Sequence, residues 1–217
     1  MKATESMLDS RLDGYRYADA NHTVAHGYLL PAVENILSTL ELPVESRRIF
    51  ELGCGNGSVA NWLNTLGYEV VGVDPSVEGI AQAGSHFPHV RLESGSCYDD
   101  LAGKHGTFPV VLSLEVVEHV FLPRLFAKTV FDLLQPGGVA IVSTPFHGYW
   151  KNLALALSGK MDAHFTALWD YGHIKFWSFK TLGALLEEAG FSEIRFMRVG
   201  RIPLLAKSMI AIAIKIS

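Results

Sequence analysis

The 217-residue sequence predicts an α/β fold, with one seven-stranded, mostly parallel sheet, an antiparallel last strand and helices on both faces. Three observations predict this fold. Short apolar runs alternate with helical patterns, which indicates parallel strands joined by crossover helices. The first apolar run enters a glycine-rich turn, ELGCGNG. The last two runs are joined by the short connection 200–207, which suggests a closing antiparallel hairpin.

The elements follow in order along the chain. The expected strands are 48–52, 69–73, 90–94, 109–114, 138–144, 192–199 and 208–216. The expected helices between them are 58–65, 77–84, 122–134 and 180–189. Gly190 is predicted to cap the last helix, and the stretch LLQPGG at 133–138 is predicted to cap the helix before it in the same way.

A single domain, 1–217, is expected from the length and from an apolar content of 49%. Two segments lie outside the strand–helix alternation. They are an N-terminal helix pair within 1–40 and the segment 146–172, which is rich in aromatic residues. Both are expected as helical lids at the carboxyl ends of the strands, where open α/β sheets bind ligands. The aromatic residues of 146–172 suit either a hydrophobic cover over an acceptor or the core of a helix.

Charge and composition exclude several classes of partner. The formal net charge is −4 and no Lys/Arg run exceeds two residues, so duplex nucleic acid is not an expected partner. Two cysteines do not make a disulfide scaffold, which favours a reducing cytoplasm. No membrane span or signal peptide is expected. Peripheral membrane contact by 152–161 stays open, as does the oligomeric state.

The glycine turn is the first candidate binding site. Gly53, Gly55 and Gly57 follow a strand and precede a helix, and glycine lets a ligand approach the backbone. Neither the dinucleotide fingerprint G-x-G-x-x-G nor a Walker loop is present. Glu51 would repel a pyrophosphate but suits the amino and sulfonium groups of S-adenosylmethionine. Cys54 is expected to be a small residue facing the ligand rather than a nucleophile.

Asp74 ends the second strand about 20 residues after this turn, within the stretch VVGVDPS. A carboxylate at this place can accept two hydrogen bonds from ribose hydroxyls. The alternative is that Asp74 caps the next helix. Pro75, the following residue, is placed in the same predicted cofactor site.

The stretches ELGCGNG, GVDPS, LEVVEH and LLQPGGVAIVSTP together resemble the class I S-adenosylmethionine-dependent methyltransferases over most of 48–145. This resemblance implies a Rossmann-like sheet of seven strands with a reversed last strand. It also implies cofactor contacts at Gly53, Gly55 and Asp74, adenine contacts at Ser96, Cys97 and Tyr98, and packing of Leu114 on the cofactor.

The stretch LEVVEH is the candidate for chemistry. Glu115, Glu118 and His119 are spaced so that they would share one face of a helical turn at the end of the fourth strand. Two carboxylates and an imidazole that converge are costly unless they meet a cation or work as a relay. The alternative is a solvated helix start whose acids favour the helix dipole.

Two stretches of this chain resemble the ubiquinone-biosynthesis O-methyltransferases. The first is E-x-x-E-H, and the second contains Gly172, His173 and Phe176. A similar arrangement occurs in the terminal 2′-O-methyltransferases of small RNAs. The resemblance implies a divalent metal, Mg, Mn, Fe or Zn, held by Glu115, Glu118, His119 and His173. Such a metal lowers the pKa of a bound hydroxyl. Without metal, His119 or His173 would serve as general base, with His147 in reserve.

The sequence therefore predicts an S-adenosylmethionine-dependent methyltransferase that acts on a hydroxyl of a small or amphipathic acceptor. One alternative is a metal-independent N- or C-methyltransferase. Another is a non-catalytic module that binds S-adenosylmethionine. An NAD-dependent oxidoreductase is disfavoured, because the dinucleotide fingerprint is incomplete and Glu51 stands at the turn.

Overall fold

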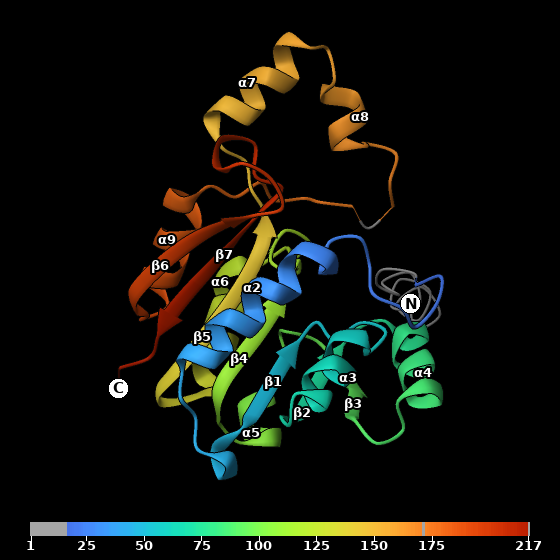
Figure 1. Ribbon diagram of the computed structural model, residues 1–217, viewed down its shortest axis with the longest axis vertical. Coiled ribbons are helices and arrows are strands. Elements are labelled where there is room, and N and C mark those ends of the chain that lie inside the picture. Colours follow the sequence, from blue (N-terminus) through green and yellow to red (C-terminus); the bar gives the residue numbers. More distant parts are fainter. Residues whose placement is uncertain (1–16, 171, 217) are drawn as a thin grey trace, which may run out of the picture.

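Seven strands form one sheet in the order β3-β2-β1-β4-β5-β7-β6 in the computed structural model, which describes residues 17–170 and 172–216 (Figure 1). The strands are β1 (Arg48–Leu52), β2 (Glu69–Asp74), β3 (Arg91–Ser94), β4 (Phe108–Leu114), β5 (Leu134–Pro145), β6 (Ser192–Val199) and β7 (Ser208–Ile214). Strands β1 to β5 pair in parallel, and β7 is antiparallel to both of its neighbours. The predicted fold class is confirmed.

Helices cover both faces of the sheet. They are α2 (His26–Thr39), α3 (Ser58–Thr65), α4 (Val77–His86), α5 (Leu101–His105), α6 (Pro123–Asp132), α7 (Tyr149–Leu157), α8 (Met161–Phe165) and α9 (Phe179–Glu188), with short 3-10 turns η1 (Val44–Ser46) and η2 (Pro203–Leu205). Helices α2 and α3 pack on one face, and α5, α6 and α9 pack on the other. Helix α4 adjoins β2 and β3.

The sheet is buried on both sides because successive strand residues point to opposite faces. On β1, Ile49 joins the core under α2 and α3, and its neighbour Phe50 joins the core under α5, α6 and α9. All seven residues of β4 are buried. This explains why the central strands read as continuous apolar runs rather than as an alternating pattern.

The junction between α6 and β5 differs from the prediction. Helix α6 ends at Asp132, and β5 already begins at Leu134. The stretch LLQPGG is therefore not a glycine cap, and the C-cap residue Leu133 has a right-handed helical conformation. Gly137 instead lies inside β5 with φ +78°, where the pairing with β4 is irregular, and its N–H donates to the carbonyl of Lys215. The glycine permits a bulge in the strand.

The predicted cap of the last helix is present. Gly190 follows α9 with φ +103°, and its N–H donates to the carbonyl of Glu187. The next amide, of Phe191, donates to the carbonyl of Leu186. A left-handed residue at this place ends the helix and satisfies its last carbonyls.

Of the two segments outside the strand–helix alternation, 146–172 lies at the carboxyl-end side of the sheet, whereas α2 of the N-terminal segment packs on one face of the sheet (Figure 1). Helices α7 and α8, from the 146–172 segment, project beyond the tips of the parallel strands (Figure 1). Of the expected N-terminal helix pair, α2 is described, and residues 1–16 lie outside the described part, as does Tyr171. Among the described residues, no helix has the length and apolarity needed to cross a bilayer. The cytoplasmic location stays a prediction.

Candidate active site

The glycine turn joins β1 to α3 at the point where the strand order reverses between β1 and β4. Gly53, Gly55 and Gly57 have φ values of +86°, +51° and +75°, a region that disfavours residues with a Cβ. The amides of Gly53 and Cys54 both donate to the carbonyl of Val73 on β2. The turn is therefore fixed against the neighbouring strand.

Asp74 holds this turn in place. Its Oδ2 accepts from the N–H of Gly55 at 2.9 Å, and its Oδ1 accepts from the N–H of Ser76 at 2.8 Å. Ser76, not Asp74, caps α4, since its hydroxyl accepts from the N–H of Gly79. Each carboxylate oxygen can accept a second bond, so Asp74 also keeps acceptor capacity for a ligand.

Glu51 lies beneath the turn and is 3% exposed. Its Oε2 has no hydrogen-bond partner within the described ranges. Burial, and then the charge of Asp74, raise the pKa of Glu51 well above its usual value. An orphaned acid beside a second buried acid suits a ligand that brings positive charge or donors, which is the chemistry of the amino and sulfonium groups of S-adenosylmethionine. Burial also raises the pKa of the Cys54 thiol, so it stays protonated and a poor nucleophile.

The segment 17–21 lies over the glycine turn. The Tyr17 hydroxyl is so close to Gly55 that a Cβ there would lie 2.1 Å from it. The side-chain amide of Asn56 donates to the carbonyls of Asp19 and Asn21. The main chain before α2 therefore packs directly on the predicted cofactor site.

The residues predicted to contact adenine lie on the loop between β3 and α5. This loop is closed by two local bonds, from the N–H of Ser96 to Asp99 and from the N–H of Tyr98 to the Ser96 hydroxyl. The Tyr98 hydroxyl accepts from the N–H of Leu122, and Cys97 is half-buried against the core. Leu114 is buried at the end of β4, and Pro75 is exposed after β2.

The stretch after β4 forms a turn rather than the expected helical face. The N–H of His119 donates to the carbonyl of Val116 within this turn, and α6 begins only at Pro123. Val116 packs against the glycine turn, because a Cβ at Gly53 would lie 2.3 Å from its Cγ2. The loop that carries the candidate chemical groups is thus in contact with the glycine turn through Val116.

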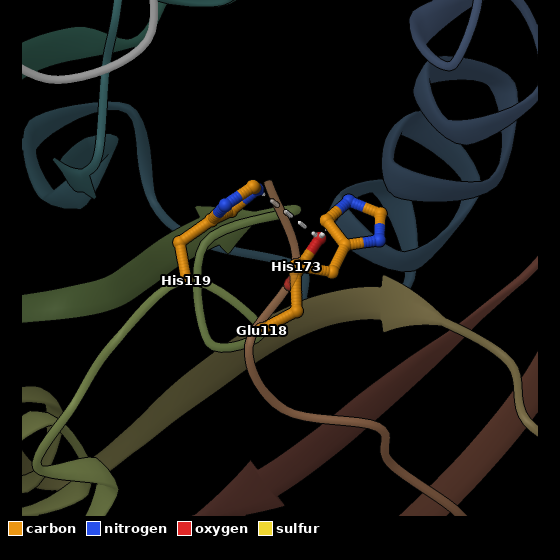
Figure 2. A group of neighbouring side chains, drawn as sticks. All are labelled: Glu118, His119 and His173. Carbon is orange, nitrogen blue, oxygen red and sulfur yellow. Dashed lines mark ion pairs between the residues drawn. The ribbon is translucent and has the colours of Figure 1, made fainter. Parts of the chain in front are cut away.

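Glu118, His119 and His173 form a compact cluster (Figure 2). Glu118 Oε1 lies 4.0 Å from Nε2 of His119 and 4.0 Å from Nε2 of His173. The two rings flank the carboxylate, one from the loop after β4 and one from the segment between α8 and α9 (Figure 2). Ligand atoms around one ion with bonds of about 2.1 Å lie about 3–4 Å apart, so the cluster has the size of a metal site.

The electrostatics of Glu118 favour a cation. Glu118 is fully buried, and neither carboxylate oxygen has a partner in hydrogen-bonding geometry among the described residues. Burial, followed by the charge of Glu115, raises the pKa of Glu118 well above its usual value, and the nearby Thr144 hydroxyl acts in the opposite direction. Burial also lowers the pKa of His173 to about 4, so its imidazole is neutral and able to ligate.

Glu115 lies beside this cluster rather than in it. Its Oε1 accepts from the Ser143 hydroxyl at 2.8 Å, and its Oε2 accepts from the Ser208 hydroxyl at 3.2 Å. Ser208 is also in hydrogen-bond contact with the hydroxyl of Tyr28. Burial raises the pKa of Glu115 to about 7. Its left-handed backbone, with φ +56°, aims it toward β5 and β7.

His147 belongs to an aromatic cluster outside the Glu118 group. Its ring stacks on Phe165 and meets Phe176 edge-on, with centroids 5.8 Å and 5.0 Å apart. Burial lowers its pKa to about 4, and Nδ1 has no hydrogen-bond partner within the described ranges. The structure thus places this reserve base at the root of the 146–172 segment.

Comparison with known proteins identifies the family. The sequence profile of the methyltransferase domain matches residues 22–194. The chain belongs to the methyltransferase domain family. The expected resemblance to class I S-adenosylmethionine-dependent methyltransferases is thereby confirmed.

Relatives of this methyltransferase domain include the ubiquinone biosynthesis O-methyltransferase of Caulobacter sp. (strain K31), which is 39% identical over 131 residues, 58% of this chain and 50% of the relative. The chain spans about half the length of the curated relatives it matches.

Solved structures confirm the fold. The methyltransferase domain of bacterial CtHen1-C aligns with a TM-score of 0.64 at 20% identity, covering 85% of this chain and 95% of that one. Magnesium protoporphyrin IX methyltransferase from Synechocystis PCC 6803, solved with bound SAH, aligns with a TM-score of 0.60 at 20% identity, covering 85% and 80%.

A cavity of about 530 Å³ opens next to the cluster of Glu118, His119 and His173. Its lining includes Glu115 and His173 together with four residues that the sequence did not single out, Tyr28, Lys151, Arg201 and Lys207. These four belong to no motif and come from three separate segments, α2, α7 and the connection between β6 and β7. The sequence signal available for them was weak, namely two basic residues on the connection between the last two strands.

Replacing Gly53 with Ala is expected to destabilise the methyltransferase domain by about 2 kcal/mol or more, because the new Cβ clashes with Val116 and φ is positive. Urea unfolding measures the change. Gly27→Ala in α2 is the control, since nothing lies within 4 Å of its Cβ, and it should stabilise the helix by about 0.5–1 kcal/mol. Equal stabilities of the two variants would contradict the contact between the glycine turn and Val116.

Proposed function

We propose that the chain transfers a methyl group from S-adenosylmethionine to a hydroxyl oxygen of a small or amphipathic acceptor, with a divalent metal held by Glu118, His119 and His173. The observation that carries the proposal is the buried carboxylate of Glu118, which lacks hydrogen-bond partners within the described ranges and lies between two imidazoles. The curated relatives named ubiquinone biosynthesis O-methyltransferase support an oxygen acceptor.

The cofactor would lie on the glycine turn. Gly53 and Gly55 present backbone to it, Glu51 faces its positive charge, and Asp74 accepts from its ribose hydroxyls while ordering the turn. The loop residues Ser96, Cys97 and Tyr98 would border the adenine, with Leu114 and Pro75 at the strand ends. The segments 1–40 and 146–172 would act as lids over this site, an assignment that rests on the position of residues 17–21, α7 and α8.

A bound divalent metal would lower the pKa of the acceptor hydroxyl and polarise it. Glu118, His119 and His173 would hold that ion next to Val116, and so next to the glycine turn. The acceptor hydroxyl, made more acidic by the ion, would release its proton to water. Its oxygen would form the bond to the methyl carbon as the carbon–sulfur bond breaks, and the electron pair of that bond stays on sulfur. Glu115 is the fourth ligand that the resemblance implies, but it lies outside the group of ligand atoms within 4.8 Å of one another, so the proposal rests on the other three.

The metal-independent alternative keeps the same cofactor site. His173 is neutral at pH 7 and would be placed to accept the proton of the acceptor, but its lowered pKa of about 4 makes it a weak base. His119, whose Nδ1 lies 3.3 Å from the carbonyl of Gly172, is the second candidate base. His147 would be a more remote third.

Isotope labelling separates these proposals. Protein purified without chelator is mixed with S-adenosylmethionine carrying a ¹³C methyl group and with catechol, and the product is analysed by NMR. We expect an O-methyl product, a loss of about tenfold or more in rate after EDTA treatment, and recovery with Mn²⁺ or Mg²⁺. Label on nitrogen or carbon acceptors in a parallel screen, with no effect of EDTA, would favour the metal-independent enzyme. Binding of SAH with no turnover of any acceptor would favour a binding module.

A further inference from the structure

The cavity beside the Glu118 cluster is lined by several basic side chains, although the net charge of the chain is −4. Lys151, Arg201 and Lys207 line it, and among the residues that the structure describes Glu115 is the one acid in its lining. These three basic side chains outnumber the one carboxylate, whatever the protonation state of Glu115. The balance of charge in the cavity is therefore positive.

The fold brings these cations together from two distant segments. Lys151 lies on α7, and Arg201 and Lys207 lie near the two ends of the connection between β6 and β7. Gly200 turns this connection sharply, with φ +92°, and a Cβ there would lie 2.9 Å from Cβ of Lys207. The Lys151 ammonium donates to the carbonyls of Phe146 and Lys207, at 2.9 Å and 3.4 Å, and so ties α7 to the connection.

None of the three cations forms an ion pair with a carboxylate of residues 17–170 or 172–216. The Lys207 ammonium lies over the ring of Tyr28, 5.2 Å from its centroid. Burial lowers the pKa of Lys151, and the charge of Arg201 lowers it further, so the two cations repel each other. Like charges in a half-buried cavity are costly unless an anion joins them.

We propose that this cavity binds an anionic group of the methyl acceptor, a carboxylate or a phosphate, through Arg201 and Lys207, with Lys151 at its base. The proposal deepens the proposed function and rests on it for the identity of the ligand as the acceptor. His173 belongs both to the cavity lining and to the cluster with Glu118 and His119. An acceptor whose anionic end is bound in the cavity could therefore place a hydroxyl at that cluster.

Direct binding of simple probes tests the charge preference. Benzoate and phenyl phosphate are titrated into the protein with and without SAH, with benzyl alcohol as the neutral probe, and binding is followed by NMR. We expect saturable binding of the anions and weak binding of benzyl alcohol. The double variant Arg201→Gln/Lys207→Gln should lose about tenfold or more in anion affinity, equivalent to about 1.4 kcal/mol. The ratio of the two anion affinities distinguishes a carboxylate site from a phosphate site.

The matched control is Lys180→Gln/Arg195→Gln, which removes one Lys and one Arg that are exposed and lie outside the cavity lining. It should bind the anions as the wild type does. The proposal is overturned if the anions bind no better than benzyl alcohol, or if both double variants weaken binding equally. SAH affinity is measured on every protein. If no SAH binds to the wild type, the proposed function is contradicted. If Arg201→Gln/Lys207→Gln keeps its SAH affinity but loses anion binding, the cavity acts on the acceptor and not on the cofactor.

Discussion

Replacing Glu118 with Gln is expected to lower kcat/KM for methyl transfer by about 100-fold or more, and to raise the stability of the metal-free protein. Both effects follow from one observation, a buried carboxylate whose oxygens have no hydrogen-bond partner among the described residues. Without a cation this buried carboxyl must take up a proton that it would not hold in the unfolded chain, which costs stability, and the neutral amide removes that cost. With a cation the same carboxylate is a ligand. Loss of a residue that only supports a ligand reduces metal affinity or activity by about 10–100-fold, and loss of the ligand itself is expected to cost more.

Thermal unfolding with and without Mn²⁺, together with the methylation assay, measures both effects. Mn²⁺ should raise the Tm of the wild type and leave the Tm of Glu118→Gln unchanged, since only a protein that binds the ion is stabilised by it. Glu188→Gln is the control, because Glu188 is an exposed glutamate paired with Arg124 and should change neither readout. A Glu118→Gln protein that keeps its turnover and its response to Mn²⁺ would show that Glu118 is not a ligand.

Replacing Asp74 with Ala is expected to weaken SAH binding by about 100-fold and to destabilise the fold by about 3 kcal/mol. The carboxylate accepts from the amides of Gly55 and Ser76, and each bond to a charged group contributes about 1.5–3 kcal/mol. Without Asp74 both buried amides lack acceptors and the glycine turn loses its fixed shape. The proposed ribose contacts are lost as well.

Calorimetry with SAH and urea unfolding measure the two quantities on the same protein. Asp132→Ala is the control, since Asp132 ends α6 on the surface and pairs with Lys128. Because a misfolded turn alone could abolish binding, Asp74→Asn is the second variant. It keeps one acceptor and should recover part of the stability but little of the affinity. SAH affinity within about threefold of the wild type in Asp74→Ala would contradict the assignment of the cofactor site.

Local patterns were enough to predict the glycine turn and the strand and helix on either side of it. The glycine turn, its preceding strand and Asp74 are adjacent in sequence or one βαβ unit apart, and their chemistry depends on φ values and hydrogen bonds within that unit. The termination of α9 at Gly190 is equally local. Such features are readable from sequence because the residues that decide them are close in the chain.

Non-local pairing explains what the sequence did not reveal. Gly137 reads as a helix cap, but its amide pairs with Lys215 at the far end of the chain, so it lies in a strand bulge. Glu115 looks like a partner of Glu118 on a helical face. In the structure its carboxylate turns toward Ser143 and Ser208, and the meeting with Ser208 depends on the insertion of β7 between β5 and β6. The cationic cavity depends on the same insertion.

A crystal structure of the protein soaked with SAH and Mn²⁺ would show whether the methyl donor and the metal lie on the two sides of the contact between Gly53 and Val116. We expect SAH on the glycine turn, with its ribose at Asp74, and an anomalous Mn²⁺ peak bounded by Glu118, His119 and His173. SAH bound elsewhere would contradict this expectation. A structure with SAH on the glycine turn but no Mn²⁺ at Glu118, His119 and His173, even at saturating Mn²⁺, would contradict it as well.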